Sequence, residues 1–109
     1  MKVKTADLIG LALDWAVAQC EGFEYDTESG LLYSHEEPHF FKRYSSDWSQ
    51  GGPIIEREGI TLRCGLHGWD AELEEFDAIS HGPTALIAAM RCFVSSKLGD
   101  EIDVPDELV

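Results

Sequence analysis

The chain has 109 residues, 44% hydrophobic and 10% aromatic. A chain of this length buries roughly 65% of its unfolded surface around a single core, and this composition excludes wholesale disorder. Its 21 acidic and 8 basic residues give a formal net charge of -13, which argues against nucleic-acid backbones and anionic membranes as partners, and no apolar run approaches the about 20 residues that span a bilayer.

The first predicted element is a helix over residues 5–19, where apolar residues recur at spacings of three and four. Thr5 or Asp7 can cap its first turn, and Gly22 ends it. Residues 23–30 form a polar connection with a turn cluster. The short aromatic-rich stretches 31–34 and 40–44 predict strands or irregular segments packed over the core.

The middle of the chain predicts a loop followed by strands. Residues 47–53, Asp-Trp-Ser-Gln-Gly-Gly-Pro, show no periodicity, and Gly-Gly-Pro permits unusual backbone angles. Residues 54–58 and 60–64 flank Gly59 and predict two strands joined by a tight turn. A second turn covers residues 65–68. Acidic and apolar residues then alternate over 69–76, which is typical of a half-buried edge strand.

The last predicted helix covers residues 83–98, with Pro83 at its first position, an apolar face over 85–98, and Lys97 and Gly99 at its end. The acidic tail is expected to be extended or frayed, although Ile102 and Val104 can pin part of it to the core. These elements predict an α+β fold, a small antiparallel sheet of three to four strands with two helices packed on one side. We expect a single domain over residues 1–99 and a C-terminal tail over 100–109.

Two stretches are compositionally unusual: residues 44–58, which contain Trp-x-x-Gly-Gly-Pro, and residues 82–91, Gly-Pro-Thr-Ala-Leu-Ile-Ala-Ala-Met-Arg. Together with residues 1–8, 13–18 and 96–101, they resemble the NinX-like proteins of lambdoid bacteriophages and prophages. The resemblance covers most of the chain and implies an accessory phage product made inside the infected bacterium. Ala85 stands where the family often has Pro, and residues 65–81 match least.

Metal and catalytic motifs are weak. The potential metal ligands are too poorly spaced to complete a tetrahedral set, so we expect no metal and no cofactor; they are Cys64, His67, His35, His39 and His81. Cys20 and Cys92 lie on apolar helix faces and are predicted to be core residues. No arrangement of nucleophile, base and orienting group indicates an enzyme, and a small hydrolase using Cys64 or a carboxylate is the least favoured reading.

The segment around Trp48 favours recognition of an anionic ligand. An indole can stack on a planar ring, an amide can recognise a base edge, and glycine backbone donors suit an oxyanion. Arg57 and Arg91 can supply charge, and Thr84 opens a helix whose N-terminus attracts anions. Alternatively, Trp48 folds onto the core and Arg91 extends to solvent. The predicted ligand-binding residues are Asp47, Trp48, Ser49, Gln50, Gly51, Gly52, Arg57, Thr84 and Arg91.

The charges are segregated along the chain. Residues 70–77 and 100–109 each hold five acids and no base, whereas residues 38–69 and 78–99 together hold six bases and three acids. We therefore predict a non-enzymatic binder of a small anionic, nucleotide-like ligand, such as a host defence signal. The alternative is an acidic protein inhibitor or DNA mimic that acts on a basic host protein. Three cysteines without a CxxC pair indicate a reducing cytoplasm, and three tryptophans allow a homodimer contact.

Overall fold

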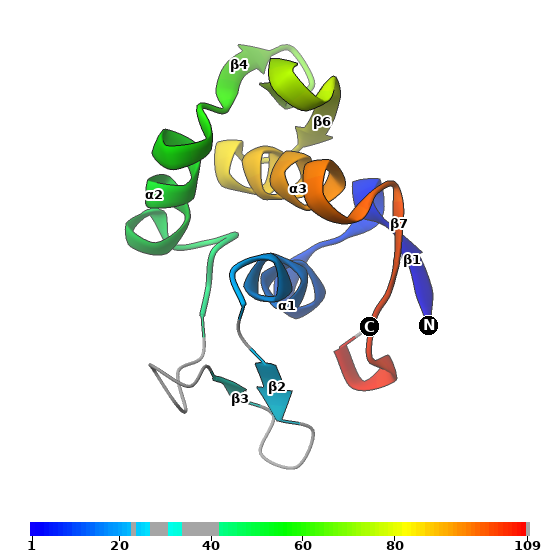
Figure 1. Cartoon of the computed structure of the whole chain (residues 1–109). Coiled ribbons are helices and arrows are strands. Elements are labelled where there is room, and N and C mark those ends of the chain that lie inside the picture. The colour runs from blue at the N-terminus through cyan, green and yellow to red at the C-terminus, as the bar shows by residue number, and fades with distance from the viewer. Residues whose placement is uncertain (23, 27–30, 34–41, 109) are drawn as a thin grey trace.

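The computed structural model describes residues 1–22, 24–26, 31–33 and 42–108. Every strand pairing in these residues is antiparallel, in the sheets β1-β7, β2-β3 and β4-β5-β6 (Figure 1). The helices are α1 (Gly10–Cys20), α2 (Trp48–Glu58) and α3 (Ala85–Leu98), with 3-10 turns η1 (Thr5–Asp7), η2 (Glu74–Phe76) and η3 (Asp106–Leu108). The strands are β1 (Lys2–Lys4), β2 (Glu24–Asp26), β3 (Leu31–Tyr33), β4 (Thr61–Gly65), β5 (Gly68–Leu73), β6 (Ala78–Gly82) and β7 (Glu101–Asp103).

The predicted α+β class is confirmed, and helix α3 occupies its centre. One side of α3 packs on the three-stranded sheet, and α1 and α2 pack against α3 away from that sheet (Figure 1). The three helices of the described residues lie on the same side of the three-stranded sheet, as predicted for two: α2 lies beside α3, and α1 lies on the far side of α3 from the sheet (Figure 1). Because α3 is covered from both sides, its apolar residues are buried almost all round, including Met90, Phe93 and Val94.

The largest difference from the sequence prediction concerns residues 47–58. Neither the loop over 47–53 nor the strand over 54–58 exists, because residues 48–58 form helix α2. Gly59 has a φ of 71° and ends this helix with a hydrogen bond from its N–H to the carbonyl of Ile55. A helix-ending glycine and a hairpin glycine need the same left-handed backbone, so the sequence signal was ambiguous. Burial of Ile54 against the core favours the helix.

Strand β5 is central, whereas residues 69–76 were predicted to form an edge strand. Residues 78–82, which we assigned to no element, form β6 and pair with β5 on the side opposite β4. Its small residues Ala78, Ser80 and Gly82 are buried and Ile79 is exposed, so the sequence carries no apolar alternation that would have identified this strand. The first helix also starts later than predicted, since residues 5–7 form a 3-10 turn and α1 begins at Gly10.

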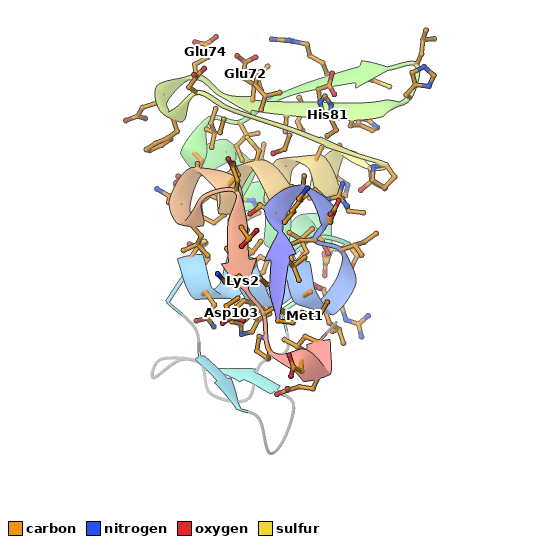
Figure 2. The ribbon with its side chains drawn as sticks, turned by 90° about the vertical axis from the view of Figure 1, so that its right-hand side faces the viewer. Met1, Lys2, Glu72, Glu74, His81 and Asp103 are labelled. Carbon is orange, nitrogen blue, oxygen red and sulfur yellow. The ribbon has the colours of Figure 1, made fainter. Side chains whose placement is uncertain are left out.

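Strand β7 ties part of the C-terminal tail to strand β1 (Figure 2). Lys2 lies opposite Asp103, and the amino group of Met1 donates a 2.9 Å hydrogen bond to the Asp103 carboxylate. Ile102 and Val104 are buried, as the pinned alternative predicted, so residues 101–104 are not frayed. Within the ranges that the structure describes, no helix has both the length and the apolar character needed to cross a membrane.

Candidate functional site

The N-terminal ends of α1, α2 and α3 border one depression in the surface. It consists of two adjoining hollows of about 410 and 280 Å³ that share Ser45, Ser46 and Ile87. The larger hollow is also lined by Ile9, Gly10, Leu11, Asp14 and Arg43, and the smaller by Trp48, Thr84 and Leu86. We call this combined depression the helix-end groove.

The groove has an apolar rim. Ile9, Leu11 and Trp48 are 57%, 49% and 55% exposed, although large apolar side chains normally lie in the core. A gathering of such side chains around a hollow typically marks a binding surface. The alternative that Trp48 is folded into the interior is therefore wrong, and its indole is open to solvent beside the groove.

The polar residues around Trp48 hold the start of α2. Asp47 is the N-cap, and its carboxylate accepts hydrogen bonds from the Ser49 N–H at 2.9 Å, the Ser49 hydroxyl at 2.6 Å and the Gln50 amide at 3.2 Å. These bonds to the charged form lower the pKa of Asp47. The side-chain Oε1 of Gln50 accepts a hydrogen bond from the backbone N–H of Arg43 at 2.6 Å. The groups that we expected to contact a ligand are thus engaged in a helix cap.

Neither of the paired glycines provides special backbone angles, which corrects the sequence prediction, and Gly51 instead permits close packing. Neither Gly51 nor Gly52 has a positive φ. A Cβ on Gly51 would lie 2.4 Å from the Tyr44 carbonyl oxygen and 2.7 Å from Cδ2 of Leu86. Only glycine therefore permits α2 to approach both neighbours so closely. The Gly51 N–H donates to the Asp47 carbonyl within the helix.

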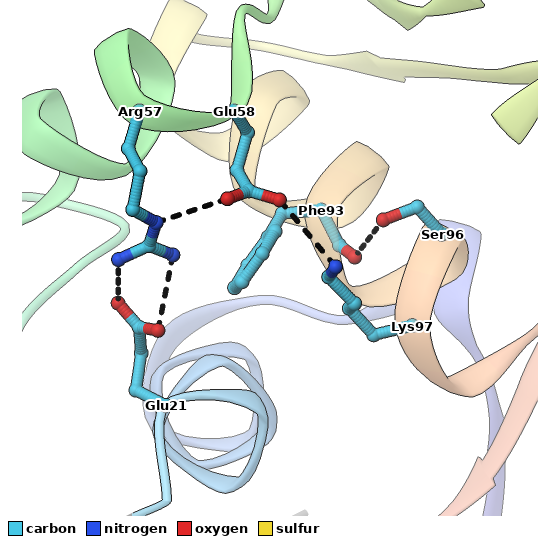
Figure 3. A network of polar contacts seen from close by, with 6 residues as sticks. All are labelled: Glu21, Arg57, Glu58, Phe93, Ser96 and Lys97. Atoms are coloured by element: carbon cyan, nitrogen blue, oxygen red, sulfur yellow. Dashed lines mark hydrogen bonds and ion pairs between the residues drawn. The ribbon is translucent and has the colours of Figure 1, made fainter. Parts of the chain in front are cut away.

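Arg57 lies at the far end of α2 from Trp48, in an ion-pair network (Figure 3). Its guanidinium donates to both carboxylate oxygens of Glu21 at 2.9 and 3.0 Å and to Glu58 at 2.9 Å. Glu21 and Glu58 raise the pKa of Arg57, and the hydrogen bond from Arg57 lowers the pKa of Glu58. Lys97 pairs with the other oxygen of Glu58 at 3.5 Å. The expectation that Arg57 lies beside Trp48 is wrong.

Arg91 is also held away from the groove. Its Nε donates to the Leu8 carbonyl at 2.8 Å and its Nη1 to the His81 carbonyl at 2.9 Å. It therefore ties the segment before α1 and the end of β6 to α3. The arginine that lines the groove is Arg43, which the sequence analysis did not select.

Thr84 is the one predicted residue besides Trp48 that lines the groove. Its hydroxyl caps α3 by accepting from the Ile87 N–H at 3.1 Å. Asp14, which we missed, is 4% exposed and accepts from the N–H and hydroxyl of Ser45 at 2.8 and 2.6 Å. Burial raises the pKa of Asp14. This pair fixes the turn that carries Arg43 and Ser46 against α1.

The other groups considered for chemistry are dispersed. Burial raises the pKa of the Cys20 and Cys92 thiols to about 11, which keeps them protonated and poorly nucleophilic at neutral pH. Among the described residues, no three His, Cys, Asp or Glu side chains gather where they could hold a metal ion. His35 and His39 lie outside the described residues. His81 contacts the Asp70 carboxylate on the outer face of the sheet.

The fold and the groove define a small α+β protein with an apolar-rimmed surface depression. The shielded thiols of Cys20 and Cys92 are poor nucleophiles. A family model described as bacteriophage P22 NinX matches residues 4–97. The chain belongs to this family and is therefore a phage accessory protein, as the resemblance implied. The comparison with curated proteins gave no match. The matched range includes every residue that lines the helix-end groove.

Proposed function

We propose that this phage accessory protein acts in the cytoplasm of its host as a non-enzymatic binder of a small anionic, nucleotide-like ligand. The observation that carries the proposal is that an exposed tryptophan and an arginine line the two adjoining hollows of one groove. Trp48 borders the smaller hollow, Arg43 lines the larger, and Ser45, Ser46 and Ile87 belong to both.

The chemistry of the groove suits such a ligand. An aromatic base can stack on the indole of Trp48, while the planar fork of Arg43 matches a phosphate or carboxylate. Small-molecule pockets have volumes of about 300–1,000 Å³. The larger hollow, at about 410 Å³, falls in this range, and the smaller, at about 280 Å³, lies just below it. The first turn of α1 adds a partial positive charge, because no described side chain caps its start at Ile9 and Gly10.

Capture of this kind would remove a nucleotide-derived signal from the host without turning it over. The net charge of -13 opposes an anionic ligand at long range. We therefore expect affinity to come from short-range stacking and pairing and to change little with moderate salt. Binding dominated by long-range charge would instead fall steeply as salt is added.

Calorimetry with linear and cyclic nucleotides tests the proposal. We expect binding by the wild-type protein, a loss of about 5- to 150-fold with Trp48→Ala, and partial retention with Trp48→Phe, since stacking on a base contributes about 1–3 kcal/mol. Arg43→Ala should also weaken binding. Arg57→Ala is the matched control, because it removes an arginine that lies outside the groove.

Absence of heat and of any thermal shift at millimolar ligand would overturn the proposal. Product formation in the same mixtures would identify an enzyme instead. Association with a basic host protein that weakens steeply with salt and survives Trp48→Ala would support the alternative, an acidic inhibitor or DNA mimic.

A further inference from the structure

We propose that the β4–β5 hairpin, residues 61–73, is a contact through which two copies of this chain associate about a two-fold axis. This contact lies apart from the helix-end groove and does not depend on the function proposed for it. Three features of the hairpin carry the inference: a partly uncovered apolar face, a self-complementary shape and a tip without formally charged side chains.

The apolar face of the sheet continues past the cover that α3 provides. Along β5, Leu73 and Ala71 are buried, but Trp69 on the same face is only partly buried. Cys64, which lies directly opposite Trp69 in the register, is exposed. At the turn, Leu66 is 99% exposed. The hairpin therefore exposes Leu66, Cys64 and part of the Trp69 side chain beyond the cover that α3 provides.

The same end of the hairpin combines a projection and a hollow. Beside Leu66 lies a depression of about 450 Å³, lined by residues 65–70 and His81. A two-fold axis brings a patch onto its own copy, so a stable contact needs both features within one patch. The Leu66 side chain of each copy can then enter the hollow of the other. This self-complementarity favours a second copy over an unrelated partner.

The charge pattern points to the same occupant. Two copies with a net charge of -13 each repel one another, and a basic partner would be drawn to the acidic segments instead. Residues 64–69 at the hairpin tip contain no Asp, Glu, Lys or Arg, whereas the strands behind the tip carry Arg63, Asp70 and Glu72, and Arg63 pairs with Glu72 at 3.0 Å. The acidic Glu74 follows the other end of β5 (Figure 2). The hairpin tip is thus a place where like-charged copies can meet.

The edge of the sheet can extend this contact. Within the described residues, β4 pairs on one side only, with β5. Its other edge leaves backbone donors and acceptors that a second strand can pair with. Antiparallel pairing of β4 with the β4 of a second copy is compatible with a two-fold axis. The exposed charge of Arg63 on this strand disfavours association beyond a dimer.

Sedimentation velocity from about 1 µM to about 1 mM tests the proposal. We expect a reversible, concentration-dependent dimer for the wild-type protein and a monomer throughout the range for Leu66→Lys. Because Leu66 is 99% exposed, this variant should keep the wild-type melting temperature at concentrations where both are monomeric. Ile79→Lys, on the outer edge strand β6 of the same sheet and 61% exposed, is the matched control and should dimerise normally.

A wild-type protein that stays monomeric at about 1 mM would overturn the proposal. So would dimerisation of Leu66→Lys at wild-type strength. A dimer that Trp48→Ala dissociates and Leu66→Lys does not would place the contact at the groove and would also refute the assignment to the hairpin.

Discussion

The same substitution at the two neighbouring glycines of α2 should have different outcomes. A Cβ on Gly51 would overlap the Tyr44 carbonyl oxygen at 2.4 Å and Leu86 at 2.7 Å. Overpacking of this kind costs about 1–3 kcal/mol, and the upper end applies because one neighbour is backbone. Alanine recovers about 1 kcal/mol of helix propensity. We therefore expect Gly51→Ala to lower the free energy of unfolding by about 2 kcal/mol.

Gly52→Ala is the matched control. The nearest atom to its added Cβ is Cε3 of Trp48 at 3.7 Å, an ordinary contact. Gly52 precedes Pro53, and a Cβ on the residue before a proline disfavours the helical conformation, which opposes the gain in helix propensity. Gly52→Ala should therefore change the free energy of unfolding by less than about 1 kcal/mol. Urea denaturation followed by circular dichroism measures both changes, and the melting temperature of Gly51→Ala should fall by about 10 °C. Equal stability of Gly51→Ala and wild type, or an equal loss in the two variants, would refute the close-approach argument.

Three further predictions concern stability. Thr84→Ala should cost about 1 kcal/mol by removing the N-cap of α3, and thermal denaturation would measure the loss; an unchanged melting temperature would contradict the cap. Arg57→Ala should cost only about 0.5–1 kcal/mol because the side chain is 50% exposed, and this difference should shrink in high salt; a salt-independent loss would point to packing on Phe93 instead. Burial raises the pKa of Asp14 in the folded state, so protonation of Asp14 favours the folded state. The free energy of unfolding relative to Asp14→Asn should therefore increase as the pH falls from the raised pKa toward 3.8. This gain should be lost as the pH rises through the raised pKa. Urea denaturation of both proteins across pH tests this, and a pH-independent difference would contradict it.

The fold was predictable where local signals agreed. The last helix combined an N-terminal proline, an apolar sequence and a terminal glycine, and it was predicted over 83–98, whereas α3 spans Ala85–Leu98 with Thr84 as its N-cap. The predicted strands over 60–64 and 69–76 correspond to β4 and β5, although residues 74–76 form the 3-10 turn η2 and β5 is central in its sheet. Helix α2 was missed because two glycines and Pro53 lower helix propensity, whereas burial of Ile54 and the close fit of Gly51 outweigh that preference.

The candidate site was predictable only in part. Trp48 and Thr84 line the groove, but Arg43 and Asp14 gave no local signal. The groove owes its shape to contacts between distant positions, such as the hydrogen bonds of Asp14 with Ser45, 31 residues apart. Arg91 reaches Leu8 across 83 residues. No pattern within a short window reports contacts of this kind.

Composition, charge and motif strings by themselves determined the α+β class, the acidic character, the last helix and the resemblance to the phage family. Tertiary structure decided which polar groups are used up inside the chain and which side chains remain at the surface. The physical reason is that a polar group takes whichever partner folding brings within hydrogen-bond distance. Hydrogen bonds within the chain engage the side chains of Asp47, Ser49, Gln50 and Arg57. The side chains of Trp48 and Leu66 remain exposed to solvent.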